Sequence, residues 1–154
     1  MLLVAVLAMN LAACGKNQVP KEQSNANATD QTQTAQTDGD VKSGLWENAI
    51  YNTDTELGKG SKNLIVEVKA DNQSVEFTIH TDASTVGEAL LENNLIAGDD
   101  SQYGLYIKSV NGIVADYDVD QSYWAFYVDG EYATAGADST DIVEESVYKF
   151  EYTK

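Results

Sequence analysis

The feature that most constrains the fold is a run of aromatic residues that leads into the pair Asp129-Gly130. An Asp-Gly pair supplies the positive φ angles that a two-residue hairpin turn needs. The flanking residues on both sides are aromatic and β-branched, which suits strands. The sequence therefore predicts a β-hairpin over residues 123–136, and this hairpin is the strongest local signal in the chain.

The two faces of this hairpin have different expected roles. Successive side chains of a strand point to opposite sides, so Trp124 and Phe126 share one face, whereas Tyr123 and Tyr127 share the other. Large aromatic residues on one face of an antiparallel sheet are most often core residues. We expect Trp124 and Phe126 to pack in the core, while Tyr123 and Tyr127 are as well suited to a ligand as to packing.

Four further segments carry secondary-structure signals. Alternating apolar residues flank a turn at residues 71–74, which predicts a hairpin over residues 64–79. Thr85 and Glu88 form a possible capping box for a short helix that ends at Asn93-Asn94. Asn111-Gly112 predicts a hairpin turn between strands at 105–110 and 113–117, and the alternating residues 147–152 predict a last strand.

The start of this region gives weaker signals. Residues 46–52 are interpreted as irregular or strand-like, and residues 57–60, Leu-Gly-Lys-Gly, as a loop. One helix after a strand pair, with more strands behind it, indicates an α+β domain of β-grasp-like architecture. We expect a mainly antiparallel sheet, one short helix and additional β-hairpins over residues 41–154.

The N-terminal residues have a different character. Residues 1–13 are apolar and uncharged, and the segment Leu11-Ala12-Ala13-Cys14-Gly15 resembles the lipobox of a bacterial lipoprotein signal peptide. Cleavage before Cys14 would leave a lipid-modified cysteine, whose acyl chains anchor a protein to a membrane. The alternative is a buried helix that happens to end in cysteine. The lipobox predicts an extracytoplasmic protein that is lipid-anchored to the bacterial cell membrane.

Residues 14–40 follow as a polar segment of Gln, Asn, Thr, Ala and Asp without aromatic residues. Such a composition cannot bury enough apolar surface to offset the entropy of ordering, so we expect a disordered tether. It would hold the folded domain away from the membrane at a distance of about 25–30 Å on average.

The segments of the domain, taken in order, resemble a domain-of-unknown-function family of bacterial surface lipoproteins. The resemblance rests on the segments 57–60, 77–80, 85–91, 104–112 and 123–130. That family is similar in turn to the C-terminal β-domain of transcobalamin and intrinsic factor, which implies a β-grasp-like fold and a corrinoid-binding ancestry. In the vertebrate carriers a separate helical domain completes the site, and nothing in this chain resembles that domain. The residues that match the ligand-facing region of the family are Tyr123, Trp124, Tyr127 and Tyr132.

The charge of the chain limits its partners. The protein has 25 acidic residues against nine basic residues, all of them lysine, for a formal charge of −16. Nucleic acids and phosphate groups depend on basic side chains for attraction, so the composition argues against nucleic acid as a partner. A solvated acidic surface is the simplest reason for this charge.

One acidic segment could bind a metal ion. Asp116, Asp118 and Asp120 stand at alternate positions, as at the start of a calcium loop, and carboxylate oxygens suit Ca²⁺. The calcium-loop pattern then fails, because Gln121 stands where glycine is needed and Tyr127 where glutamate is needed. If the segment is extended, the three carboxylates share one face and predict weak Ca²⁺ binding; the alternative is a solvated acidic surface.

The residues of catalytic chemistry are few. His80 is the single histidine, and it is expected on a strand face away from the core. Cys14, the single cysteine, would be consumed by lipid, and no phosphate-binding glycine loop occurs. We therefore predict a non-enzyme that requires no cofactor. Two functions remain: a tethered module that binds a corrinoid or another small molecule, or a surface module that adheres to a protein or glycan, with a weakly bound divalent cation.

Overall fold

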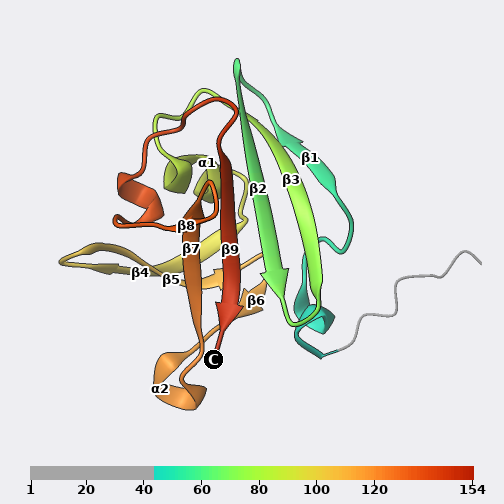
Figure 1. Ribbon diagram of the computed structural model, residues 1–154, viewed down its shortest axis with the longest axis vertical. Coiled ribbons are helices and arrows are strands. Elements are labelled where there is room, and N and C mark those ends of the chain that lie inside the picture. The colour runs from blue at the N-terminus through green and yellow to red at the C-terminus, as the bar shows by residue number, and fades with distance from the viewer. Residues whose placement is uncertain (1–43) are drawn as a thin grey trace, which may run out of the picture. The chain divides into compact units, whose positions relative to one another are not determined.

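The computed structural model describes residues 44–154 (Figure 1). The predicted signal peptide, the lipidated Cys14 and the tether up to residue 40 lie outside the described residues. In chain order the elements are η1 (Gly44–Asn48), β1 (Thr55–Gly58), β2 (Lys62–Ala70), β3 (Gln73–Thr81), α1 (Val86–Glu92), β4 (Ile96–Ser101), β5 (Gly104–Val110), β6 (Ile113–Val114), α2 (Tyr117–Asp120), β7 (Tyr123–Val128), β8 (Glu131–Tyr132), η2 (Ala137–Ser139) and β9 (Val147–Thr153).

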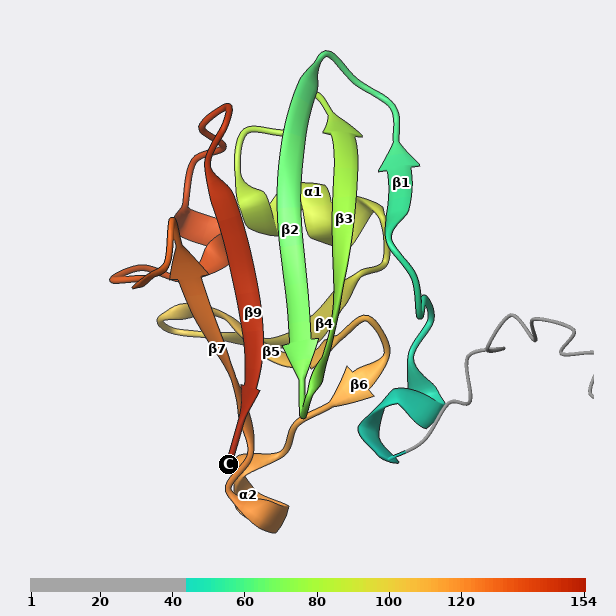
Figure 2. The ribbon, with the colours of Figure 1, turned by 45° about the vertical axis from the view of Figure 1, so that its right-hand side comes forward.

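The strands form two sheets. The larger has six strands in the order β1-β3-β2-β9-β7-β8, and the smaller has three in the order β4-β5-β6. Two pairings, β1 with β3 and β2 with β9, are parallel, and the others are antiparallel. Figure 2 shows α1 and the small sheet behind one face of the large sheet, while its other face stays open. The predicted α+β class, with a mainly antiparallel sheet, agrees with this arrangement.

The core lies between the covered face of the large sheet and α1 with the small sheet. Along β2 and β3 buried and more exposed residues alternate, so that Val66, Val68, Phe77 and Ile79 are all buried. Tyr148 and Phe150 of β9 continue this buried face and are inaccessible to solvent. One buried face and one open face is the pattern that a half-covered antiparallel sheet requires.

The predicted capping box is confirmed at the start of α1. The Thr85 hydroxyl accepts a hydrogen bond from the Glu88 N–H, and the Glu88 carboxylate accepts one from the Thr85 N–H. The helix ends at the C-cap Asn93, and Asn94 follows with φ 55°. Because a helix this short depends on packing, its buried Val86, Ala89 and Leu90 hold it on the sheet.

Two expectations about strands were wrong, and of the two alternatives for residues 46–52 the irregular one is confirmed. Residues 57–60 were expected in a loop, but Leu57 and Gly58 belong to β1, which pairs with β3. Residues 46–52 begin in the 3₁₀ helix η1, so the strand-like alternative fails there. Residues 113–117 contribute only the two residues of β6, because Asp116 caps a helical turn instead of continuing the strand.

Asn111, in the turn between β5 and β6, joins the small sheet to the start of the domain. Its side chain accepts a hydrogen bond from the Tyr51 N–H at 3.0 Å and donates one to the Tyr51 carbonyl at 2.8 Å. Its φ is 51°, and Gly112 has φ 79°, as a tight hairpin turn requires. The Asn-Gly pair therefore forms the predicted turn and also ties residues 50–51 to the small sheet.

None of the helices in residues 44–154 has the length and apolar character needed to cross a membrane.

Candidate functional site

The β7–β8 hairpin has the predicted turn and register. Asp129 and Gly130 have φ angles of 50° and 83°, and Tyr127 pairs with Tyr132 across the hairpin. The second strand is shorter than expected: β8 has two residues, and the ladder ends with a hydrogen bond from the Ala133 N–H to the Phe126 carbonyl. Because this turn fixes the register, it also fixes which tyrosines are neighbours.

Trp124 and Phe126 lie on the covered face, as the alternation indicated. Their exposed fractions are 8% and 9%. The Trp124 indole donates a hydrogen bond to the Ile113 carbonyl at 3.2 Å and packs edge-on against Tyr152. Trp124 therefore joins the large sheet to β6, and its indole N–H is already paired.

Tyr127 and Tyr132 lie together on the open face. Their rings meet edge to face, with centroids 5.4 Å apart, and Tyr132 is 62% exposed. The Lys149 ammonium lies 4.4 Å from the centre of the Tyr127 ring, in cation–π geometry. We call Tyr127, Tyr132 and Lys149 the tyrosine cluster; it is a rigid, partly exposed aromatic surface at one end of the large sheet.

Glu151 holds Lys149 in place. Lys149 and Lys69 each contact one oxygen of the Glu151 carboxylate, at 2.8 Å. The hydrogen bonds from Lys149 and Lys69 hold the pKa of Glu151 below its ordinary value, and the bond to Glu151 raises the pKa of Lys69. Because the Glu151 carboxylate contacts the Lys149 ammonium, it keeps this group over the Tyr127 ring.

Tyr123 is separate from the tyrosine cluster. It lies four residues before Tyr127 on the same strand face, which corresponds to about 13 Å along a strand. It pairs with Thr153 of β9 and is 36% exposed. The four predicted ligand-binding residues thus lie in three places: Trp124 in the core, Tyr123 near the α2 end, and Tyr127 with Tyr132 near the hairpin turn.

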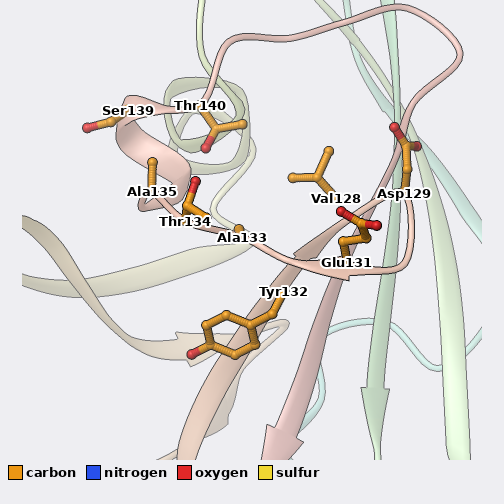
Figure 3. A pocket seen from close by; sticks show the side chains of 9 residues that line it. All are labelled: Val128, Asp129, Glu131, Tyr132, Ala133, Thr134, Ala135, Ser139 and Thr140. Atoms are coloured by element: carbon orange, nitrogen blue, oxygen red, sulfur yellow. The ribbon is translucent and has the colours of Figure 1, made fainter.

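An open hollow of about 640 Å³ lies next to the same hairpin (Figure 3). Its lining residues are Val128, Asp129, Glu131, Tyr132, Ala133, Thr134, Ala135, Ser139 and Thr140. In Figure 3 the Tyr132 ring points away from Val128 and Thr140, so Tyr132, which also belongs to the tyrosine cluster, lies at the edge of the hollow. The hollow is not among the predicted sites, because it forms where η2 folds back beside β8, and no local pattern signals such a contact.

The three alternate carboxylates do not share one extended face. Asp116 is the N-cap of α2, and its carboxylate accepts hydrogen bonds from the N–H groups of Asp118 and Val119. Asp120 contacts the Lys154 ammonium at 2.8 Å. Hydrogen bonds from Lys154 and Ser122 lower the pKa of Asp120 to about 2. The prediction of an extended segment was wrong, because Asp116 caps a helix and the chain turns there. The carboxylates therefore have different partners: Asp116 binds backbone N–H groups and Asp120 binds Lys154.

No group of three or more His, Cys, Asp or Glu side chains in residues 44–154 is placed to hold a metal ion. His80 lies on β3, and its imidazole contacts the Glu56 carboxylate of β1. This pair joins the edge strand β1 to its neighbour. The contact between His80 and Glu56 therefore gives His80 a structural role in the sheet.

Comparison with known proteins identifies relatives of the domain. Residues 83–154 match the model of the Domain of unknown function DUF4430. No curated protein matches the chain. A solved structure of haptocorrin in complex with Cbi matches with a TM-score of 0.44 and 20% identity, over 64% of this chain and 26% of that chain, so the chain spans about a quarter of that protein's length.

A second solved structure, of a candidate metal-binding protein from Ruminococcus gnavus ATCC 29149, matches with a TM-score of 0.58 and 30% identity. The match covers 61% of this chain and 98% of that protein. The Ruminococcus gnavus protein thus corresponds over nearly its whole length to the domain described above. The chain belongs to the same family as this Ruminococcus gnavus protein, and its residues 83–154 match the DUF4430 model.

Proposed function

We propose that this protein is a membrane-tethered, extracytoplasmic lipoprotein that binds a ligand on its tyrosine cluster and catalyses no reaction. The observation that carries the proposal is the exposed Tyr127–Tyr132 pair with Lys149 fixed beside it. Aromatic rings that are held rigidly bind flat or ring-shaped ligands at a low cost in conformational entropy. The ligand would lie across the end of the large sheet, against the faces of these rings.

The lipobox at Leu11–Gly15 supports the tether, since Cys14 would carry the lipid anchor. The topology supports a β-grasp designation: β2 and β9 are parallel neighbours, β3 and β7 flank them, and α1 follows the β2–β3 hairpin. A single β-domain of this kind offers one binding surface, so a large ligand would leave its other side free for a partner protein.

A corrinoid is the first ligand to test, because the sequence resembles the transcobalamin β-domain at this hairpin. Cobinamide or cobalamin added to the full chain should change the visible absorption spectrum and raise the melting temperature. Tyr127→Ala and Tyr132→Ala should each remove the response. Tyr106→Ala is the matched control, since Tyr106 is a partly exposed tyrosine of β5, in the other sheet. No response at high micromolar ligand would exclude the corrinoid.

A second candidate function is adhesion to a surface protein or glycan. It is favoured by tyrosines that are exposed outside β7 and β8, at Tyr103 and Tyr117, which are 88% and 56% exposed. A broad contact area would weaken when Tyr123 or Tyr127 is replaced by alanine, and Tyr103→Ala would weaken it further. Binding of immobilised polysaccharide measures this function. If only Tyr127→Ala has an effect, a compact ligand site is the better description.

Binding of a divalent cation stays a prediction at Asp116, Asp118 and Asp120. The Ruminococcus gnavus relative is named as a candidate metal-binding protein, which supports a test. The arrangement of the carboxylates does not suit a cation, because Asp116 caps α2 and Asp120 is paired with Lys154. Ca²⁺ would have to displace both sets of contacts. If a chelator leaves the melting temperature unchanged, the metal proposal should be dropped.

A further inference from the structure

We propose that the hollow beside β8 is a second binding site, for an amino sugar, that is, a sugar ring that carries a primary ammonium group together with hydroxyl groups. The hollow shares Tyr132 with the tyrosine cluster, but the carboxylates and hydroxyls that line it do not belong to that cluster (Figure 3). Its volume of about 640 Å³ lies in the range of small-molecule sites in proteins.

The hollow has two polar walls and an apolar floor. In Figure 3, Asp129 and Glu131 lie on one side and Thr134 and Thr140 on the other, with Val128 between them, whereas the Ser139 hydroxyl points away from Val128. Carboxylates only accept hydrogen bonds from an ammonium group, whereas hydroxyls both donate and accept. A ligand that spans this hollow therefore needs a cationic end and a hydroxyl-bearing end.

Several of these groups are free to meet a ligand. Within residues 44–154, the side chains of Glu131, Thr134 and Ser139 make no hydrogen bond or ion pair. Asp129 is held in position, because its two oxygens accept hydrogen bonds from the Ser146 hydroxyl and the Val147 N–H. The Asp129 carboxylate is thus fixed in position, and the Glu131 carboxylate is unpaired. Binding a cation here therefore costs less conformational entropy.

The acidic surroundings of the hollow favour a positively charged ligand. Residues 44–154 contain 21 acidic residues and six lysines, and no lysine lines the hollow. Four of the six lysines are paired with carboxylates elsewhere, on the open sheet face, on the β4–β5 hairpin and near α2. The negative potential therefore remains uncompensated at the hollow, where it attracts cations and repels phosphate or sulfate esters.

The hydroxyl wall distinguishes an amino sugar from other cations. A lysine side chain of a partner protein has one polar end, so it would leave Thr134 and Thr140 without a new hydrogen bond. A bare divalent cation would need a compact set of three or more oxygen ligands, and no group of three carboxylates or other strong metal ligands is gathered in residues 44–154. A sugar ring with one ammonium group matches both walls at once.

The test is isothermal titration of the full chain with a short glucosamine oligomer and with the same oligomer fully N-acetylated. The glucosamine oligomer should bind and the acetylated one should bind at least about tenfold more weakly, because acetylation removes the charge. Glu131→Gln should reduce the affinity for the glucosamine oligomer by about tenfold. Glu76→Gln is the matched control, an equal charge change at an exposed position of β3 in the large sheet, and should have no effect.

Other outcomes would overturn the proposal. Equal affinity for the two oligomers would remove the role of charge, and an unchanged affinity in Glu131→Gln would move binding away from the hollow. An oligolysine peptide that binds as tightly would favour a protein partner, and saturable Ca²⁺ binding that Glu131→Gln abolishes would favour a metal site. Tyr127→Ala should leave glucosamine binding intact, so loss of the tyrosine-cluster function and loss of this site are distinguishable.

Discussion

The two faces of β7 carry the same type of side chain and have different roles. Phe126 stacks on Phe150 with ring centroids 4.8 Å apart, and it is buried on the face of the large sheet that β5 packs against. Tyr127, the next residue, meets Tyr132 and Lys149 on a surface that no other element of residues 44–154 covers. The difference shows that aromatic content alone does not mark a binding site; the face of the strand and what covers that face decide the role.

Replacing Phe126 by alanine is the strongest test of the covered face. The change removes the stacking with Phe150 and Tyr148 and leaves a cavity, so the free energy of unfolding should fall by about 3–5 kcal/mol. Chemical denaturation of the parent and the variant measures the loss. Tyr127→Ala, the change on the open face, should cost only about 1 kcal/mol. Equal losses in the two variants would mean that the open face is covered in solution.

Trp124→Phe tests whether Trp124 belongs to the core alone. Phenylalanine keeps most of the packing against Tyr152 but leaves the buried Ile113 carbonyl without its hydrogen bond. The free energy of unfolding should therefore fall by about 1–3 kcal/mol, while binding to the tyrosine cluster is unchanged. Titration of the same ligand with the parent and the variant checks the second part. A loss of affinity without a loss of stability would show that Trp124 contacts the ligand.

The local features of the fold could be predicted from sequence because each has a local cause. Asp129-Gly130 and Asn111-Gly112 adopt the positive φ angles that their turns need, and Thr85 with Glu88 forms the capping box. The division of β7 into a buried and an open face follows from alternation. These signals depend on residues within a few positions of one another, so a single sequence contains them.

The missed features depend on contacts between distant residues. β1 is a four-residue strand whose partner β3 lies more than 20 residues later, and β4 has a glycine and two aspartates that are unusual in strands. Gly98 fits there because its backbone passes so close to Tyr106 that a side chain would clash. The hollow and the contact of Lys149 with the Tyr127 ring likewise form only when β7, β8 and β9 assemble, so no sequence motif marks them.

The smallest expected effect concerns the ion pair that joins the C-terminus to the segment before β7. Because the pKa of Asp120 is lowered to about 2 from 3.8, its contribution to stability is present above about pH 4 and is lost as the pH falls toward 2. Asp120→Asn should lower the melting temperature at neutral pH by at most a few degrees, and this difference from the parent should vanish near pH 2.

Asp118→Asn is the matched control: it makes the same charge change on the same helical turn, but its carboxylate makes no ion pair or hydrogen bond in residues 44–154. If both variants lose the same stability, general charge repulsion explains the effect. If only Asp120→Asn does, the Lys154 contact holds the end of β9 beside Tyr123, and the open face is fixed at this end by a specific interaction.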